Sequence, residues 1–359
     1  MLESSPDLCS MIKEVTFNDS MSKAKRGGPP IGGGLSRHML PQLAKRLQMV
    51  DTVTFQYMSY FDMQSPFRFL ALMKRVRRIQ YHRCRGVFIN VMRLIQAFPL
   101  LDSIAFVESG FAVGEPGCMK KVNLPQLSSL SIVGCSFEQD KMRSWFRSVN
   151  TSEHWSSIFV DVLHGYYVEE TNRLLQSAGS GLRSLGIKFP DCGPDPQVPA
   201  YRFKGRRLIA YGDQGTRFGS PCVPATRQAV MERLVLHHNT GIRHLGIHNL
   251  DIPEVSTLFD KLAATKQIRI LTIRNPSAAI AETAIEDYNA LDERLCSPAW
   301  DQLEELRIQC QGKRDLDAVM KTMHQAFPLL SARDKLCVMN APNSPSGYTS
   351  PCHYALFYS

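Results

Sequence analysis

Apolar residues recur along this chain in a short pattern: an apolar residue, two variable residues, an apolar residue, one variable residue and an apolar residue. Hexamers with this pattern begin at residues 12, 50, 76, 101, 127, 155, 182, 242, 268 and 303. From residue 50 to residue 182, consecutive hexamers begin 25 to 28 residues apart. Self-similarity at such a period is typical of repeat architectures. The alternation inside each hexamer predicts a strand with one buried face and one polar face.

Helical periodicity occupies the intervals between several hexamers. Residues 67–73 and 88–98 carry apolar residues at helical spacing, and Pro99 is expected to end the second helix. The segment Ala-Phe-Pro-Leu-Leu occurs twice, at 97–101 and at 326–330. The sequence therefore predicts one strand-and-helix unit that is repeated along the chain.

Stacked units of this kind bury one continuous core, whereas a single unit cannot bury its apolar face. We therefore predict an α/β fold, a leucine-rich-repeat-like solenoid with a curved parallel sheet on one face and helices on the other. The alternative is a doubly wound α/β domain, which also alternates strands and helices. Its buried strands are usually near-continuous apolar runs, whereas these hexamers are half polar, so we favour the solenoid.

The predicted solenoid spans residues 1–340 as a single domain, and residues 341–359 form a turn-rich C-terminal tail. Clusters of Gly, Pro and basic residues predict loop insertions at about 18–41 and 190–224. The hexamers that begin at residues 182 and 242 are about two units apart. Residues 207–211, Arg-Leu-Ile-Ala-Tyr, are the candidate for a degenerate strand between them.

The hexamers Leu-Ser-Ser-Leu-Ser-Ile and Leu-Arg-Ser-Leu-Gly-Ile, at 127–132 and 182–187, resemble those of leucine-rich-repeat proteins. The closest likeness is to the divergent repeats of fungal F-box proteins, over roughly residues 1–340. Residues 2–15, Leu-Glu-Ser-Ser-Pro-Asp-Leu-Cys-Ser-Met-Ile-Lys-Glu-Val, are similar to the segment that follows the F-box and opens the repeats. The resemblance implies recognition of substrates for a ubiquitin ligase.

Two features depart from that family. The asparagine that usually follows the strand is missing from most copies. No F-box precedes the first repeat in this chain, so we expect either a truncated gene model or a repeat module without attachment to a ligase.

Composition favours an intracellular protein, cytoplasmic or nuclear. No apolar run approaches the roughly 18 residues of a membrane-spanning helix, and the N-terminus lacks the pattern of a secretory signal. The ten cysteines are scattered without a Cys-x-x-Cys pair, which indicates reduced thiols. The net charge of +9 favours acidic partners or nucleic acid.

The positive charge is densest in residues 74–78, Lys-Arg-Val-Arg-Arg, followed by Arg83 and Arg85. Such a patch can bind phosphates, so a nucleic-acid-associated protein is the alternative hypothesis. Tyr81 lies within this region, but it occupies the last inward position of its hexamer. We therefore expect it in the core and not as a platform for stacked bases.

Candidate chemistry is sparse, and we predict no enzyme, no cofactor and no small-molecule substrate. Gly28 and Gly33 have the spacing of a phosphate-binding loop, but the lysine and hydroxyl residue that must follow are absent. The sequence has no Gly-x-Ser-x-Gly motif. A histidine cluster at residues 237, 238, 244 and 248 has no cysteine or carboxylate cluster nearby to complete a tetrahedral metal site, so no metal is predicted.

The favoured hypothesis is a non-catalytic module that binds a partner protein on the open face of the sheet, where the polar hexamer positions point. That row is mixed but leans basic, which predicts a partner with an acidic surface. The candidate contact residues are Arg78, Gln80, His82, Asp161, Lys188, His244, His248, Arg274 and Arg307, and the same face includes Ser103, Ser129, Ser131, Thr272 and Gln309.

Overall fold

The structure is a computed structural model of the chain. It describes residues 11–18, 39–58, 67–112, 126–137, 154–162, 165–190, 201–204, 207–210, 227–262, 267–275, 285–310 and 316–340. The predicted C-terminal tail and most of both predicted insertions lie outside the described residues.

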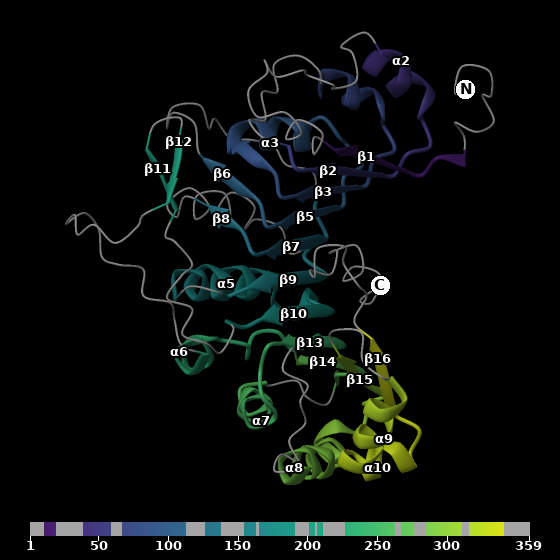
Figure 1. Ribbon diagram of the computed structural model, residues 1–359, viewed down its shortest axis with the longest axis vertical. Helices are drawn as coiled ribbons and strands as arrows, with labels where there is room; N and C mark the ends of the chain where they lie inside the picture. The colour runs from purple at the N-terminus through teal and green to yellow at the C-terminus, as the bar shows by residue number, and fades with distance from the viewer. Residues whose placement is uncertain are drawn as a thin grey trace. The chain divides into compact units, whose positions relative to one another are not determined.

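The fold is α/β, with an open sheet of 11 strands whose order follows the order of the chain (Figure 1). Within this sheet, β1, β2, β3, β5 and β7 pair in parallel with one another in that order, and so do β10, β13, β14, β15 and β16. The strands are β1 (Glu14–Asn18), β2 (Thr52–Gln56), β3 (Arg78–His82), β5 (Ser103–Val107), β7 (Ser129–Val133), β9 (Ser157–Asp161), β10 (Ser184–Lys188), β13 (His244–His248), β14 (Ile270–Asn275), β15 (Glu305–Cys310) and β16 (Leu336–Asn340).

The hexamer pattern predicted every strand of this sheet except β16. Each strand begins two residues after the start of its hexamer, because the first apolar residue belongs to the turn that enters the strand. The strand β16 carries no complete hexamer. Its side chains from Leu336 to Met339 are half-buried, so the pattern of buried and exposed positions is weak there.

Helices follow many of the strands, and the described part of the chain has eight α-helices (Figure 1). The helix predicted at 88–98 is confirmed, with Val91, Leu94 and Ile95 fully buried. Residues 67–72 form a 3-10 helix, η2. The α-helices are α2 (Met39–Arg46), α3 (Phe88–Gln96), α5 (Gly165–Ala178), α6 (Arg227–Arg233), α7 (Ile252–Phe259), α8 (Ile285–Leu295), α9 (Leu316–Ala326) and α10 (Pro328–Ala332).

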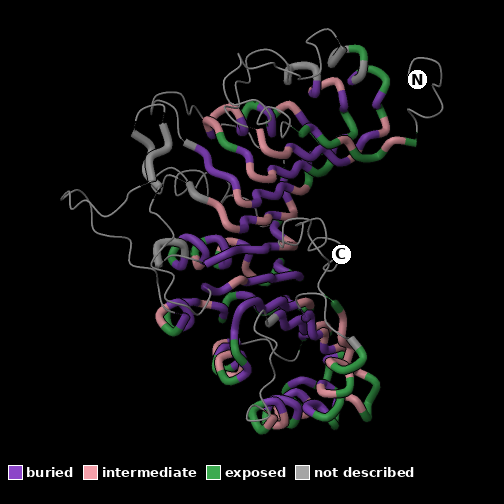
Figure 2. Tube along the Cα trace, in the orientation of Figure 1, coloured by how far each residue is buried: buried purple, intermediate pink, exposed green. Residues whose placement is uncertain are grey.

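The chain divides into two compact units, residues 1–159 and residues 160–359. In both units the buried residues follow the strands and the inner sides of the helices (Figure 2). That residues 1–340 form one solenoid stays a prediction.

A ladder of aromatic rings forms the core of the first unit. Phe17, Phe55, Tyr81 and Phe106 are register partners on neighbouring strands, and their ring centroids stack at 5.5, 5.3 and 5.3 Å. Tyr81 is fully buried, as its position in the hexamer predicted. Stacked rings add about 0.5–1.5 kcal/mol per pair to the free energy gained by burial.

Helix packing extends the core of the second unit. The rings of Phe259 and Trp300 lie 4.5 Å apart, and those of Tyr288 and Phe327 lie 5.5 Å apart in a T-shaped contact. The carboxylate of Asp292 on α8 accepts hydrogen bonds from the first backbone N–H groups of α10. This contact fixes α10 against α8.

One predicted strand belongs elsewhere in the fold. Residues 207–210 form β12 (Arg207–Ala210), which pairs antiparallel with β11 (Tyr201–Lys204) in a separate two-stranded sheet. The large sheet has no gap for a degenerate strand, because β10 pairs directly with β13. The prediction of a repeat strand at 207–211 is therefore wrong.

A smaller parallel sheet lies beyond the strand ends of the first unit. It contains β4 (Arg85–Val87), β6 (Gly110–Ala112) and β8 (Ser136–Phe137). No helix among the described residues is long and apolar enough to cross a membrane.

Candidate functional site

The turns at the strand exits of the first unit share one backbone conformation. Tyr57, Arg83, Glu108 and Gly134 follow four neighbouring strands, and each has a positive φ between 47° and 60°. The N–H of Arg83 donates to the carbonyl of Val107 at 2.8 Å, and the N–H groups of Tyr57 and Glu108 reach the next strand in the same way. This conformation is uncommon for residues other than glycine, and here the cross-strand hydrogen bonds stabilise it.

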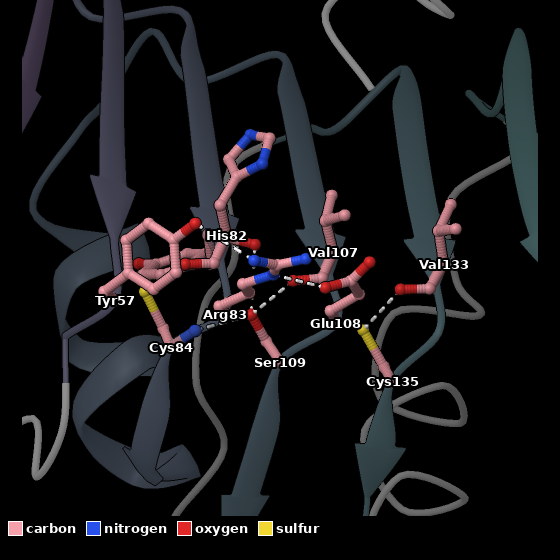
Figure 3. Close-up of polar contacts among 10 residues, drawn as sticks. Tyr57, His82, Arg83, Cys84, Val107, Glu108, Ser109, Val133 and Cys135 are labelled. Carbon is pink, nitrogen blue, oxygen red and sulfur yellow. Dashed lines mark hydrogen bonds and ion pairs between the residues drawn. The ribbon is translucent and has the colours of Figure 1, made fainter. Parts of the chain in front are cut away.

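Cys84, Ser109 and Cys135 turn inward immediately after these turns (Figure 3). The Cys84 thiol donates to the carbonyl of Phe55 at 3.3 Å, and the Ser109 hydroxyl oxygen accepts the backbone N–H of Cys84 at 3.1 Å. Burial raises the pKa of the Cys84 thiol to about 12. These side chains satisfy backbone groups inside the turns, so their role is structural.

The spacing of the inward residues relative to the hexamers is a sequence signal for them that asparagine alone does not give. Cys84, Ser109 and Cys135 each lie eight residues after the start of their hexamer. Cysteine is the other residue type that the leucine-rich-repeat pattern accepts at this position.

Outside the same turns, a row of polar side chains links the strand exits. The Arg83 side chain donates from Nε to Glu108 Oε2 at 2.5 Å and from Nη1 to the Tyr57 hydroxyl at 3.0 Å (Figure 3). Arg83 was part of the predicted basic patch. Because it forms an ion pair in this row, it contributes less to a positively charged surface.

The predicted contact row in the second unit is brought together in register. Lys188, His248, Arg274 and Gln309 occupy equivalent positions on β10, β13, β14 and β15. The Lys188 ammonium lies 3.5 Å from Oδ2 of Asp161. Five residues of the predicted face therefore form one polar row.

Much of that row is buried, which corrects the prediction of a solvent-exposed face. Asp161, His248, Arg274 and Gln309 are between 1% and 7% exposed, and Gln80 on β3 of the first unit is 7% exposed. Strands about 4.8 Å apart bring long side chains in equivalent positions against one another, so Lys188 and Arg274 flank and cover His248.

Burial also determines the protonation of two histidines in the predicted set. The pKa of His248 is well below its usual value, first because of burial and second because of the positive charges of Arg274 and Lys188. Burial and the neighbouring Arg83 lower the pKa of His82 to about 4. Both imidazoles are therefore neutral near pH 7, and neither adds positive charge to a binding surface.

The rest of the predicted set keeps contact with solvent. Arg78 is exposed, and His82, Lys188, His244 and Arg307 are half-buried. The Arg307 guanidinium pairs with the Glu305 carboxylate at 2.8 Å. Arg78 is therefore the most accessible cation among the predicted contact residues.

Arg78 also lines a pocket at the start of the first strands, which we call the strand-start pocket. Its volume is about 560 Å³. Backbone hydrogen bonds build it: the carbonyl of Lys13 accepts the N–H groups of Asp51 and Thr52, and the carbonyl of Asp51 accepts those of Arg77 and Arg78. The lining residues are Lys13, Met49, Asp51, Arg75, Arg77, Arg78 and Leu100.

Four cations line this pocket beside a single carboxylate. Lys13, Arg75, Arg77 and Arg78 are all exposed. The carboxylate of Asp51 accepts a hydrogen bond from the Thr52 hydroxyl at 2.7 Å. Summing the five charged groups leaves an excess of three positive charges, which favours an anionic ligand.

The sequence identified three of these cations but not the pocket. Lys13 and Asp51 are far from residues 75–78 in the chain, and only parallel pairing of β1, β2 and β3 joins them. A signal was available, because Lys13, Asp51 and Arg77 share the second position of their hexamers. Arg183, Arg243 and Arg269 occupy the same position in the second unit, and all three are exposed.

The described residues contain no group of three His, Cys, Asp or Glu side chains that could hold a metal ion. Comparison with protein-family models and with curated proteins finds no match to this chain.

Proposed function

We propose that this chain is a non-catalytic protein-interaction module that binds a partner with an acidic surface, and that the strand-start pocket is its principal contact site. The observation that carries the proposal is the charge of the pocket, four exposed cations around one carboxylate. Complementary charge on a partner would steer association and fix its register.

We further propose that the fold is a leucine-rich-repeat-type solenoid. Two observations support it: the strand order follows the chain order, and Cys84, Ser109 and Cys135 occupy the asparagine-or-cysteine position of the repeat. Both are typical of proteins that stack one unit on the next and bind partners along an extended surface.

The contact surface differs from the sheet face expected from the sequence. Arg78 belongs to both, because it begins β3 and lines the pocket. In the first unit the pocket therefore moves the proposed contact from the middle of the sheet face to the starts of its strands.

The resemblance to F-box proteins extends the hypothesis. In a relative that carries an F-box, the acidic partner would be a substrate for ubiquitylation. Genomic sequence upstream of Met1 tests this part. An in-frame F-box supports a substrate receptor, and its absence leaves a binding module without attachment to a ligase.

Nucleic acid is the second candidate, and the same four cations favour it. Its weakness is that Tyr81, the aromatic residue within the basic run, is fully buried and unavailable for base stacking. Outward Met49 and Leu100 side chains in the lining also suit a protein surface better than a phosphate backbone.

A capture experiment separates the two candidates. Tagged protein is incubated with extract from its source, with and without nuclease, and compared with an Arg77→Glu/Arg78→Glu variant. We expect nuclease-resistant protein partners that the variant no longer captures. The control is Lys45→Glu/Arg93→Glu, which makes the same charge change at exposed helix positions of the first unit. Loss of all partners on nuclease treatment, or equal capture by wild type and the Arg77→Glu/Arg78→Glu variant, contradicts the proposal.

A further inference from the structure

The strand-start pocket combines charge with exposed apolar surface. Among the described residues, the exposed large hydrophobic side chains are Met11, Leu100 and Leu329, and Leu100 is 52% exposed. Leu100 lines the pocket together with the half-buried Met49. Removing this exposed apolar surface from water is favourable, so a ligand that covers Leu100 would bind more tightly.

Local structure explains why Leu100 points outward. The helix α3 ends at Gln96, and the chain turns through Pro99 before β5 begins. The turn buries Leu101, whose N–H donates to the carbonyl of Phe98 at 3.2 Å, and leaves Leu100 on the outside. The exposure of Leu100 is therefore fixed by a hydrogen-bonded turn.

Met49 brings the apolar and cationic parts of the pocket into contact. Nη1 of Arg75 lies 3.1 Å from the sulfur of Met49. A ligand side chain that packs on Met49 and Leu100 would therefore lie beside the Arg75 guanidinium. Methionine adapts readily to differently shaped apolar side chains.

From these contacts we infer that the strand-start pocket binds a linear acidic segment of a partner protein, with one apolar side chain anchored between Met49 and Leu100. Carboxylates on either side of the anchor would pair with Lys13, Arg77 and Arg78. The volume of about 560 Å³ falls within the range of ligand pockets, roughly 300–1,000 Å³. This inference rests on the proposed function and specifies the ligand of the same site.

The carboxylate of Asp51 sharpens the specificity. It stands among the four cations, so it repels any anion that lies directly over it. A phosphate backbone has a charge at every step, whereas a peptide can place an uncharged residue opposite Asp51. A peptide with spaced carboxylates therefore fits the lining better than a uniform polyanion.

Fluorescence anisotropy with labelled probes tests the inference on the full chain. One probe is a peptide with a central leucine and glutamates on both sides, and the second has asparagine in place of the leucine. A single-stranded oligonucleotide is the third probe. We expect the leucine peptide to bind about tenfold more tightly than the asparagine peptide, which corresponds to one apolar side chain partly buried.

Matched variants locate the anchor. Leu100→Asn is expected to weaken the leucine peptide to the level of the asparagine peptide and to leave the asparagine peptide unchanged. Leu329→Asn is the control, because Leu329 stands at the same place in the second Ala-Phe-Pro-Leu-Leu segment, is also exposed and does not line the pocket. Its affinities are expected to match those of the wild type.

The outcomes distinguish this inference from the proposed function. Equal binding of both peptides, lost in Arg77→Glu/Arg78→Glu, overturns the apolar anchor and leaves the acidic partner supported. Peptide binding that survives Arg77→Glu/Arg78→Glu overturns both. Tighter binding of the oligonucleotide than of either peptide overturns the inference and favours the nucleic-acid alternative.

Discussion

Nη1 of Arg75 donates to the sulfur of Met49 at 3.1 Å, so a cationic and an apolar side chain share one wall of the strand-start pocket. Each of the two residues directly precedes a hexamer, Met49 the one that begins at residue 50 and Arg75 the one that begins at residue 76. Equivalent positions before successive hexamers thus supply different chemistry to one site.

The single carboxylate of the pocket provides a test by gain of affinity. Asp51→Asn keeps an oxygen for the Thr52 hydroxyl and removes the negative charge. We expect the acidic peptide to bind about threefold to tenfold more tightly, because repulsion worth about 1 kcal/mol is removed. Titration by fluorescence anisotropy measures the change. Glu293→Gln, an exposed position on α8, should leave the affinity unaltered; an equal gain there would point to net charge and not to the pocket.

The aromatic ladder should dominate the stability of the first unit. Phe106→Ala removes a fully buried ring that stacks on Tyr81 at 5.3 Å. We expect a loss of about 3–5 kcal/mol in the free energy of unfolding. Urea denaturation followed by circular dichroism measures it, with the exposed Leu329→Ala as control. A loss below about 1 kcal/mol would contradict a packed ladder.

The inward cysteine at the β3 exit should be inert in the folded protein. Because the pKa of the Cys84 thiol is about 12, almost no thiolate is present at pH 8. We expect alkylation of Cys84 to require unfolding, whereas the half-buried Cys337 is labelled earlier. Peptide mapping by mass spectrometry after timed iodoacetamide treatment follows both sites. Labelling of Cys84 as fast as Cys337 would place its thiol at the surface.

Stability should fall in mild acid because the pKa values of His82 and His248 are lowered in the folded chain. His82 takes up a proton near pH 4 in the folded chain but near pH 6.5 in the unfolded chain. Between these values the unfolded state binds more protons, so the contribution of His82 is complete above about pH 6.5 and is lost as the pH falls towards 4. The pKa of His248 is shifted in the same direction.

We expect the stability lost through His82 between about pH 6.5 and pH 4 to be about 1–3 kcal/mol. His82→Asn should flatten this part of the stability profile, which urea denaturation at a series of pH values records. His154→Asn, an exposed position, is the control. An unchanged profile in His82→Asn would mean that His82 titrates normally in the folded protein.

The Asp292 carboxylate should be essential for the start of α10. It accepts hydrogen bonds from the N–H groups of Leu329 and Leu330 at 2.6 and 3.0 Å, and Asp292 is 1% exposed. Asp292→Ala leaves these donors without their acceptor, so we expect a loss of about 2–3 kcal/mol in the free energy of unfolding. Glu293→Ala, the exposed neighbouring position, should change it by less than about 0.5 kcal/mol. Equal stability of the two variants would contradict the cap.

Local patterns predicted most of the sheet because apolar alternation has a direct physical cause in strand burial. The helix at 88–96 was predictable for the same reason, since its apolar face recurs at helical spacing. The prediction for residues 207–211 was wrong because a short apolar run is compatible with any partly buried strand. Whether that strand joins the large sheet or pairs with β11 depends on long-range contacts, which sequence periodicity does not specify.

The candidate site was predictable only in part. The basic run at 74–78 identified three pocket cations, but Lys13 and Asp51 join them through parallel register between distant segments. Alternation predicted which strand positions carry the polar side chains, but it did not predict how far those side chains are exposed to solvent. Whether Arg274 is reached by solvent depends on the length and packing of neighbouring side chains, which alternation alone does not specify.

The affinity of a leucine-containing acidic peptide for the wild type and for Arg77→Glu/Arg78→Glu tests directly whether an acidic partner binds at the strand-start pocket. We predict that the double substitution weakens binding at least about 30-fold at physiological salt, equivalent to about 2 kcal/mol, while Lys45→Glu/Arg93→Glu changes it by less than about threefold. Equal weakening in both double variants, or none in either, would contradict binding of an acidic partner at the strand-start pocket.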